Sequence, residues 1–457
     1  MKYYEKLKAY IDRYGIKNLF YKVVEKSTAG YDCYRDTEPL TEEELDRQRR
    51  HRFENAVEIS IVVPVFEPSP KAFMQTLNSV KEQTYENWQL CIVDAGKQKR
   101  RAAVKKVFGD DIRVSYLEID NKGISENTNA AIEITTGEYV GFLDHDDILE
   151  PDALYQMMLK IEQGFELIYS DEDKVNEGLD YYFSPYYKPD YNFNLLLSNN
   201  YICHFTVMKK SLILKAGLLR PEYDGAQDYD LLLRAIEYTG KIGHIPRILY
   251  HWRAGDNSTS DNPFNKKYAF DAGKRAIEDY LKRNYHKGVK VSETDDPGYY
   301  RLICTSKGRL TVTSVVDGII PDDKENEVPD YYLLLDSDMK ISDSDIDKLL
   351  KRAYFTGADI IVPKITSKGR YLYNGIARTG NGHTPFLQGK KEWFRGPFNL
   401  AVTNMDVHVA PSKGILIRKS LYEPDIFSKS FHINSMKGKF KGIKMVYAPE
   451  ALITKQR

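Results

Sequence analysis

Four consecutive residues, Asp144-His145-Asp146-Asp147, carry the side chains with the clearest chemical potential in this sequence. Three carboxylates placed so close together repel one another unless a cation lies among them. Mg²⁺ and Mn²⁺ prefer oxygen ligands and keep open positions that phosphate oxygens can fill. The cluster therefore predicts a divalent-metal site for a phosphate-containing ligand. The alternative is a solvated acidic loop, with Asp152 as a carboxylate at a helix N-terminus.

Two other polar positions have the character of nucleotide contacts. Asp94 ends an apolar segment, where its carboxylate can accept a hydrogen bond from the N–H of a pyrimidine base. A tight turn capped by Asp94 is the alternative. Asn121-Lys122-Gly123 leads into a helical stretch, so it can bind a ribose or phosphate near a helix N-terminus. A plain helix cap explains the same residues.

Two motifs further along the chain can act on a substrate. Asp228 stands just before an apolar helical stretch, and a carboxylate away from the metal suits a general base that takes a proton from a hydroxyl. A helix N-cap is an equal alternative. His251-Trp252-Arg253 precedes a small-residue segment, 254–260. His251 can complete a metal shell, although a lone histidine is more often structural. Arg253 can clamp a diphosphate through two N–H groups.

The elements that must position these residues alternate between short apolar runs and helical stretches. The apolar runs are Ile59–Pro64, Gln89–Asp94, Arg113–Leu117 and Glu138–Asp144, and the clearest helical stretches are 70–83 and 123–135. This alternation predicts βαβ units, a mostly parallel sheet and an α/β fold. Ligands bind beyond the carboxyl ends of such strands. We therefore expect Pro64-Val65-Phe66, Asp94 and the acidic cluster to line one crevice.

The sequence also repeats itself. Tyr139–Asp146 matches Tyr331–Asp338 without a gap, so Asp336 and Asp338 repeat Asp144 and Asp146. The register continues with Leu167–Tyr169 against Asp359–Ile361 and with Lys210–Leu212 against Lys419–Leu421. The second copy, roughly 300–457, has room for only one opening strand, within Arg309–Val316, followed by a loop at 322–327.

The repeat predicts three parts: an N-terminal extension (1–56), a main domain (57–288) and a shortened second domain (289–457). The turn Asp295-Asp296-Pro297-Gly298 lies near the second boundary. Residues 2–26 read as a basic amphipathic helix, which can lie on an anionic membrane surface or pack on the domain behind it. Residues 27–56 read as a connector.

The composition is ordinary for a globular chain of 457 residues, with 42% hydrophobic and 29% charged residues. Lys+Arg and Asp+Glu both number 66, which argues against a nucleic-acid partner. The four scattered cysteines suggest neither a disulfide framework nor a zinc site and fit a reducing compartment. No signal-peptide layout and no apolar run of the roughly 20 residues that span a bilayer is seen. We expect a cytoplasmic protein.

Three enzyme classes are disfavoured. The sequence has no G-x-x-x-x-G-K-[ST] motif of P-loop enzymes and no G-x-S-x-G motif of hydrolases. A nucleotidyltransferase would need a glycine-rich phosphate loop after the first strand. Phe66–Pro70 occupies that place and contains no glycine.

Taken together, the motifs resemble family 2 glycosyltransferases with the GT-A fold, a Rossmann-like sheet flanked by helices, over about residues 58–260. The resemblance rests on Ile61–Val65, Gln83-Thr84-Tyr85, Val93-Asp94, Asn121-Lys122-Gly123, Gly137-Glu138-Tyr139, Phe142–Asp147, Gln227–Asp230 and His251-Trp252-Arg253. The sequence is most similar to bacterial enzymes that assemble O-antigen, capsule or cell-wall polysaccharide. Such enzymes often carry a second GT-A-like unit.

The resemblance implies inverting, metal-dependent transfer of a sugar from a UDP- or dTDP-sugar to a hydroxyl of a glycan or lipid-linked acceptor. Asp228 would be the catalytic base, Asp146 and His251 would hold Mn²⁺ or Mg²⁺, and Arg253 would bind the diphosphate. The nucleotide would contact Pro64, Val65, Phe66, Glu67, Asp94, Asn121, Lys122, Asp144 and His145, and acceptor-side contacts would come from Asp171, Asp173, His204 and Gln227. Glu67 departs from the usual Asn of the family, and Gln227 from a common Glu.

Two questions stay open at this stage. The alternative function is a non-catalytic scaffold that binds a nucleotide or carbohydrate and keeps the GT-A fold. The second copy lacks counterparts of Asp94, Asp228 and His251-Trp252-Arg253. We therefore expect it to bind no donor and to serve packing, self-association or acceptor contact. Peripheral contact with a membrane is also left open.

Overall fold

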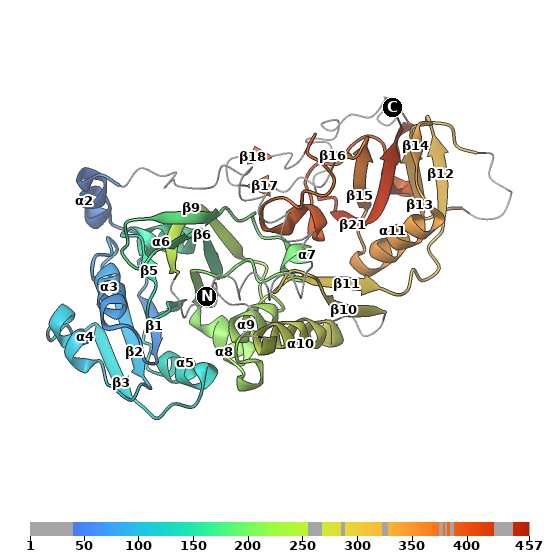
Figure 1. Cartoon of the computed structure of the whole chain (residues 1–457). Helices are drawn as coiled ribbons and strands as arrows, with labels where there is room; N and C mark the ends of the chain where they lie inside the picture. The colour runs from blue at the N-terminus through green and yellow to red at the C-terminus, as the bar shows by residue number, and fades with distance from the viewer. Residues whose placement is uncertain are drawn as a thin grey trace, which may run out of the picture. The chain divides into compact units, whose positions relative to one another are not determined.

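The computed structural model describes residues 40–254, 267–284, 288–321, 328–373, 378–379, 382–383, 388–424 and 442–456. These residues form two compact units (Figure 1). The first unit contains residues 40–191 and Asn200–Tyr280, and the second contains Asn192–Asn199 and the described chain from Leu281 onward. Assignment of Asn192–Asn199 to the second unit has no signal in the sequence. The predicted domain limits remain predictions, and the predicted helix 2–26 lies outside the described residues.

The first unit is built on one sheet, in which the described strands follow the order β3-β2-β1-β4-β8-β6-β9-β5, with β7 beside β6. Their bounds are β1 Ile59–Val65, β2 Trp88–Asp94, β3 Val114–Glu118, β4 Tyr139–Phe142, β5 Ile148–Leu149, β6 Leu167–Val175, β7 Tyr182–Tyr186, β8 Thr206–Lys209 and β9 Ile242–Arg253. β1 pairs in parallel with β2 and β4, and β2 with β3. The four predicted strands and their parallel arrangement are confirmed.

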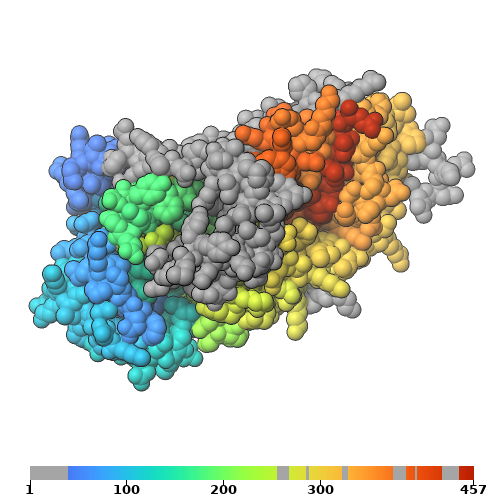
Figure 2. Space-filling view, viewed as in Figure 1, coloured from blue at the N-terminus to red at the C-terminus, as the bar shows by residue number. Residues whose placement is uncertain are grey.

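The helices of the first unit cover this sheet. They are α2 Glu42–Arg50, α3 Pro70–Lys81, α4 Arg101–Phe108, α5 Ile124–Glu133, α6 Ala153–Glu162, α8 Lys210–Ala216, the 3₁₀ turn η1 Pro221–Tyr223, α9 Gln227–Ala235 and most of α10 Lys267–Asn284. All residues of β1 and β2 are buried, as expected of parallel strands covered on both faces. α3 packs against α4, and α5 packs against β1 and β2; their surface is blue and cyan in Figure 2. None of the described helices is long and apolar enough to cross a membrane.

The second unit has its own sheet, with the order β12-β13-β20-β15-β21-β14, β16 beside β15 and β19 beside β21. The strands are β12 Val312–Val316, β13 Tyr331–Leu335, β14 Met339–Lys340, β15 Ile360–Ser367, β16 Arg370–Tyr373, β19 Met405–Asp406, β20 Ile415–Arg418 and β21 Met445–Lys455. The other elements are α7 Phe193–Leu196, the hairpin β10 Val289–Glu293 and β11 Tyr300–Cys304, α11 Asp343–Thr356, the pair β17 Arg378–Thr379 and β18 Gly382–His383, η3 Pro397–Val402 and η4 Lys419–Leu421.

The two sheets share one topology. β12-β13-β20-β15-β21-β14 repeats β1-β4-β8-β6-β9-β5, with parallel and antiparallel neighbours in the same places. Tyr331 pairs with Arg418 as Tyr139 pairs with Lys209, which is the register that the sequence repeat predicts. β12 is the predicted opening strand, whereas the predicted loop 322–327 lies outside the described residues. Within the described part of the second unit, β2 and β3 have no counterpart.

Candidate active site

The acidic cluster occupies the turn between β4 and β5. His145 is tied to the ends of two other elements: its Nδ1 donates to the carbonyl of Pro64 (3.1 Å), and its own carbonyl accepts from Thr76 Oγ1 (3.1 Å). β1 ends at Val65, so the turn lies at the carboxyl edge of the parallel strands. This placement is where ligands bind in open α/β sheets.

Asp147 is the structural member of the cluster. Its carboxylate is 1% exposed and accepts hydrogen bonds from the Tyr250 hydroxyl and from the backbone N–H of Arg253 (2.7 Å). Burial, together with Asp144 and Asp146, raises the pKa of Asp147. Both oxygens are engaged, so Asp147 joins the acidic turn to β9 and is not available to a ligand.

The surroundings of Asp144, an exposed residue, show which groups lie near it. Desolvation raises the pKa of its carboxyl group; Asp146 and Asp228 act in the same direction, and His204 and His145 oppose them. Carboxylates from the β4–β5 turn and from α9 therefore lie close enough to influence one another. The predicted crevice that Pro64-Val65-Phe66, Asp94 and the acidic cluster would line together stays a prediction.

Arg253 ends β9 beside the acidic turn. Its Nε donates to the carbonyl of Asp146 (2.6 Å) and its Nη1 to the carbonyl of Glu177 (3.1 Å). Its Nη2 is buried and has no hydrogen-bond partner among the described residues. Burial lowers the pKa of the Arg253 guanidinium. A buried donor without a partner is costly, and a phosphate oxygen would satisfy it.

His251 is held differently from what its predicted role requires. Nδ1 donates to Asp173 Oδ1 (2.5 Å) and Nε2 to Glu150 Oε1 (2.7 Å), and the side chain is 2% exposed. Burial alone would lower its pKa, but the two carboxylates raise it to about 9. Both ring nitrogens carry protons in this arrangement, so a metal would have to displace a carboxylate. The role of His251 as a metal ligand stays a prediction.

Asp94 is also enclosed by protein donors. The residue is fully buried, and its carboxylate accepts from the N–H of Gly96 (2.9 Å), the N–H of Arg100 (2.7 Å) and the Tyr116 hydroxyl. These are the contacts of the turn-capping alternative, and a base N–H would have to displace one of them. Beside it, Glu67 Oε1 accepts from the N–H of Lys97 (2.6 Å).

The Asn121 segment is closed by contacts within the loop, while the N-cap of α5, Gly123, makes no side-chain cap hydrogen bond. Asn121 Oδ1 accepts from Gly123 N–H (3.1 Å) and from Asn127 Nδ2 (2.9 Å), and Lys122 N–H donates to Asn127 Oδ1 (3.2 Å). The polar groups of this loop that face each other are thus used in closing it before α5. A ribose or phosphate contact from Asn121 or Lys122 remains a prediction.

Asp228 is the carboxylate of α9 that acts on the pKa of Asp144. It stands in the first turn of the helix, is half-buried, and accepts a hydrogen bond from Asn200 Nδ2 (2.9 Å). The other acid of that turn, Asp230, is buried and paired with Arg220 and Arg234. Asp228 is therefore the more accessible of the two acids, and its role as the catalytic base stays a prediction.

The match to known families agrees with this geometry. Residues 60–218 match the sequence profile described as glycosyl transferase family 2. This part of the chain belongs to the family 2 glycosyltransferases. The mixed α/β fold with a second related sheet is the predicted fold class, and it is confirmed.

Relatives agree at the level of family. The chain is 38% identical over 276 residues to the uncharacterized protein y4gI of Sinorhizobium fredii, covering 58% of this chain and 30% of that protein. It is 32% identical over 266 residues to the O-antigen biosynthesis protein RfbC of Myxococcus xanthus, covering 56% and 20%. The chain thus spans less than a third of the length of these curated relatives. A structure of S. aureus TarS 1–349 with UDP aligns at 16% identity and a TM-score of 0.40, covering 49% of this chain and 65% of that chain, a similarity too low to argue from.

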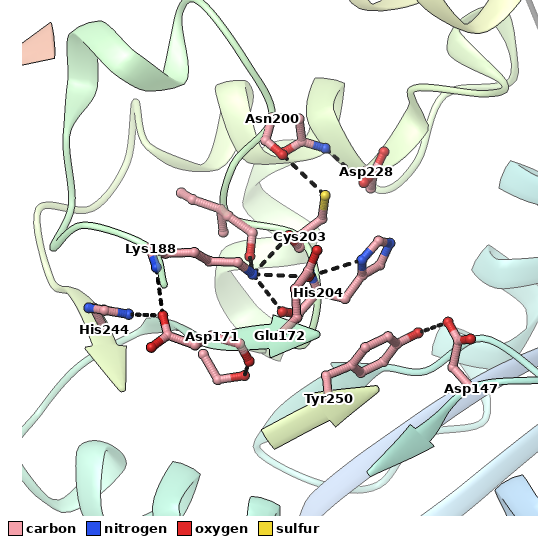
Figure 3. A network of polar contacts seen from close by, with 12 residues as sticks. Asp147, Asp171, Glu172, Lys188, Asn200, Cys203, His204, Asp228, His244 and Tyr250 are labelled. Atoms are coloured by element: carbon pink, nitrogen blue, oxygen red, sulfur yellow. Dashed lines mark hydrogen bonds and ion pairs between the residues drawn. The ribbon is translucent and has the colours of Figure 1, made fainter. Parts of the chain in front are cut away.

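The predicted acceptor contacts divide into buried and accessible residues, of which Asp171 and His204 are labelled in Figure 3. Asp171 is 2% exposed and binds the N–H of Lys188 (2.8 Å) and His244 Nε2 (2.9 Å). Asp173 is buried against His251. Both carboxylates are engaged by protein groups in this arrangement, and an acceptor contact from either stays a prediction. His204 is partly exposed, and Gln227 is half-buried with its Oε1 bound to Gly225 N–H (2.8 Å).

Two residues of the site had no place in the sequence prediction: Lys188 and Tyr250. Tyr250 could have been found, because it lies directly before the His-Trp-Arg motif on a strand. Lys188 stands between two prolines, in Pro185–Pro189, and nothing local marks it as buried. Its role depends on carbonyl groups that are 14 to 16 residues away along the chain.

The residues present fit a divalent cation held largely by substrate. Among the described residues, no group of three or more His, Cys, Asp or Glu side chains could hold a metal ion. Mg²⁺ and Mn²⁺ do not need such a cage, since they keep water and phosphate oxygens and take only one or two carboxylates. The half-buried Asp146 carboxylate, beside the unpartnered Nη2 of Arg253, meets that requirement.

Proposed function

We propose that this chain transfers a sugar, with inversion, from a UDP- or dTDP-sugar to a hydroxyl of a glycan or lipid-linked acceptor in bacterial surface polysaccharide synthesis. The observation that carries the proposal is the arrangement around Asp144. Asp146 and Asp228 both act on its pKa, and Arg253 binds the same turn with one donor unused. A metal acid, a base and a diphosphate clamp in one crevice are what such a transfer requires.

Each group has a separate task in this proposal. Asp228 accepts the proton of the acceptor hydroxyl, and Asn200 fixes the orientation of its carboxylate. Arg253 donates Nη2–H to the diphosphate as negative charge develops there. Asp146 would hold Mn²⁺ or Mg²⁺, and family 2 glycosyltransferases generally use a divalent metal ion. When bound, the ion stabilises the departing diphosphate as a Lewis acid.

The nucleotide is proposed to lie over the ends of β1 and β2. Phe66 supports this placement, because its side chain is 47% exposed directly after the buried strand. Pro64, Val65 and Glu67 are its neighbours in this part of the site. Asp94 could take part only if its present donors rearranged.

The relatives support a polysaccharide product. RfbC is named for O-antigen biosynthesis, and a chondroitin synthase of Pasteurella multocida is 26% identical over 208 residues, covering 45% of this chain and 21% of that protein. We further propose that the chain acts in the cytoplasm. The balanced charge and the scattered cysteines support that location. Peripheral membrane contact and self-association are secondary proposals.

The test is release of UDP or dTDP by the full chain with Mn²⁺ and a panel of UDP-glucose, UDP-galactose, UDP-N-acetylglucosamine and dTDP-rhamnose. We expect one donor to be turned over, and Asp228→Asn to lower its kcat by about 10²- to 10⁴-fold. Glu222→Gln is the matched control, because Glu222 is an exposed acid just before α9, and it should keep full activity.

Two outcomes would overturn the proposal. If Asp228→Asn kept the activity of the wild type, the base would lie elsewhere. If UDP bound with Mn²⁺ but no donor were turned over, the scaffold alternative would replace catalysis.

A further inference from the structure

His204 is held in a defined orientation, and the proposed function gives it no role. Its backbone N–H and its Nδ1 both face Glu172 Oε2, the latter at 3.2 Å. Its ring stacks on Tyr250, with centroids 5.1 Å apart and planes at 15°. It also lies against the Trp252 ring in a tilted arrangement, with centroids 5.5 Å apart. The side chain is 26% exposed. Figure 3 shows the second ring nitrogen, Nε2, pointing away from Glu172.

Glu172 is itself fixed by a buried lysine. The Lys188 side chain is fully buried, and its Nζ binds Glu172 Oε2 (3.1 Å) and the carbonyls of Ile202 (3.3 Å), Cys203 (2.8 Å) and His204 (2.7 Å). Burial alone would raise the pKa of Glu172, but Lys188 and His204 outweigh it and lower the pKa to about 2. Glu172 is thus a carboxylate at any working pH, and the proton on Nδ1 of His204 stays in place.

The same loop also positions the proposed base. Asn200, which donates to Asp228, lies four residues before His204, and Cys203 Sγ donates to the carbonyl of Asn200 (3.1 Å). Lys188 therefore fixes a short segment, 200–204, that carries both the partner of the base and the imidazole. Burial opposes protonation of His204, yet Glu172, Asp144 and Asp147 raise its pKa to about 9. At neutral pH its Nε2 is a donor.

We infer that His204 contacts the sugar being transferred and donates an Nε2–H hydrogen bond to an oxygen of that sugar, with Glu172 and Lys188 as positioning residues. The inference rests on the proposed function. In a single displacement the sugar must bridge the diphosphate, assigned to Asp146 and Arg253, and the acceptor hydroxyl, assigned to Asp228. His204 stacks on Tyr250, whose hydroxyl donates to Asp147 of the acidic turn, and its segment carries Asn200, the partner of Asp228. The fitting partner is a hydroxyl, acyl or carboxylate oxygen on the sugar, not on the nucleotide.

Two measurements on the full chain, one of binding and one of rate, test this assignment. One is the affinity for UDP with Mn²⁺ by titration calorimetry, and the other is kcat/KM for the donor sugar identified in the panel. We expect His204→Ala to lower kcat/KM by roughly 10- to 100-fold, as for a lost hydrogen bond from a charged donor, with UDP affinity within about twofold of wild type. His204→Gln, which keeps an N–H donor, should recover part of the loss.

The positioning residues have their own readout. Glu172→Gln removes the charge that orients His204 but leaves the ring in place. We expect it to lower kcat/KM in the same direction as His204→Ala by a smaller factor, again without changing UDP affinity. The double variant Glu172→Gln/His204→Ala should be no worse than His204→Ala alone, because the two residues act through one contact.

His244→Gln is the matched control. His244 is also held by a carboxylate, Asp171, and stacks on a tyrosine, Tyr169, at 4.9 Å and 19°, but it is 2% exposed and lies at the other end of the network in Figure 3. Its loss should lower the melting temperature while leaving kcat/KM within about twofold.

The inference is overturned if UDP affinity falls together with kcat/KM, if His244→Gln loses as much activity as His204→Ala, or if His204→Ala is fully active. Failure of the proposed function gives a different result, because wild type would then bind UDP and turn over none of the donors. In that case His204→Ala should still weaken binding of a UDP-sugar and not of UDP, and equal affinities would reject the contact.

Discussion

The two acidic pairs of this chain follow equivalent strands and have different partners. Asp144 and Asp146 follow β4. The proposed base, Asp228, acts on the pKa of Asp144, and Nη2 of the nearby Arg253 has no hydrogen-bond partner among the described residues. Asp336 and Asp338 follow β13, and Lys455 lies between them: its Nζ is 2.9 Å from Asp336 Oδ2 and 2.6 Å from Asp338 Oδ1. The second pair already has a cation, supplied by the protein.

Strand register shows where this lysine comes from. β5 pairs with β9 so that Ile148 opposes His251, and β14 pairs with β21 so that Lys340 opposes Thr454. Ile148 and Lys340 each stand two residues after the second acid of their pair. Thr454-Lys455-Gln456 is therefore the counterpart of His251-Trp252-Arg253, and Lys455 stands where the first unit has tryptophan.

The comparison shows that an Asp-x-Asp pair after a buried strand does not by itself make a metal site. The strand that ends beside it decides whether the pair meets a substrate or a lysine. The second sheet also lacks described counterparts of β2 and β3, at whose edge the nucleotide is proposed to lie. Both differences support the prediction that the second unit binds no donor.

The largest expected difference is between Asp146→Ala and Asp338→Ala. We predict that Asp146→Ala lowers kcat by about 10³-fold, the loss typical of removing one electrostatic stabiliser from a transition state. Asp338→Ala should change kcat by less than about threefold, because the carboxylate of Asp338 already binds Lys455 Nζ. Steady-state release of the nucleoside diphosphate measures both, and equal losses would contradict the comparison.

The pH dependence of stability should come from the first unit. His204 has its pKa raised from 6.5 to about 9 on folding, so its contribution is fully present below pH 6.5 and is lost as pH rises through 9. The contribution is at most about 3 kcal/mol. Burial opposes the charge of Lys455, but Asp338 and Asp336 raise its pKa, so the second pair keeps its charge through this window.

Chemical unfolding of wild type and His204→Gln at pH 6.5 and pH 9 checks this expectation. Wild type should lose more stability than the variant between the two values. An identical pH dependence would mean that His204 is not held as a cation.

A smaller effect is expected from Arg253→Lys. Lysine keeps the charge but cannot reproduce the planar set of donors, one of which is unused in Arg253. We predict a rise in KM for the donor of about tenfold, with Gln456→Ala, at the equivalent position of the second unit, within about twofold of wild type. Initial rates against donor concentration separate the two. A fully active Arg253→Lys would remove Arg253 from the diphosphate site.

The smallest expected effect follows Lys455→Met. Removing the ammonium leaves Asp336 and Asp338 facing each other, which should cost about 1–2 kcal/mol. Mn²⁺ should restore the melting temperature of this variant in an Asp146→Ala background, where the first site is absent. If Mn²⁺ did not change the melting temperature of this variant, Asp336 and Asp338 could not bind a metal ion in place of the lysine.

The sequence predicts the fold well because the signals for it are local. Apolar runs such as Ile59–Pro64 and Gln89–Asp94 correspond to buried strands, and a gapless repeat carries strand register with it. The same reasoning identifies the acidic turn, since a motif after a buried strand must lie at a sheet edge.

Partners of buried polar side chains could not be predicted in this way. His251 opposes Asp173 only because β6 and β9 pair in parallel with that register, across 78 residues of chain. Asp94 is enclosed by Arg100 N–H and Tyr116, which depend on how α4 and β3 return to β2. Lys455 needs the pairing of β14 with β21 to reach its acids. Such contacts are set by tertiary register, which local patterns do not contain.

The most direct test of the account is the number of Mn²⁺ ions bound per chain in the presence of saturating UDP, measured by equilibrium dialysis. We predict one ion for wild type and for Asp338→Ala, and none for Asp146→Ala. Two ions per wild-type chain, or one ion that is lost in Asp338→Ala and kept in Asp146→Ala, would contradict the assignment of the metal to the first unit.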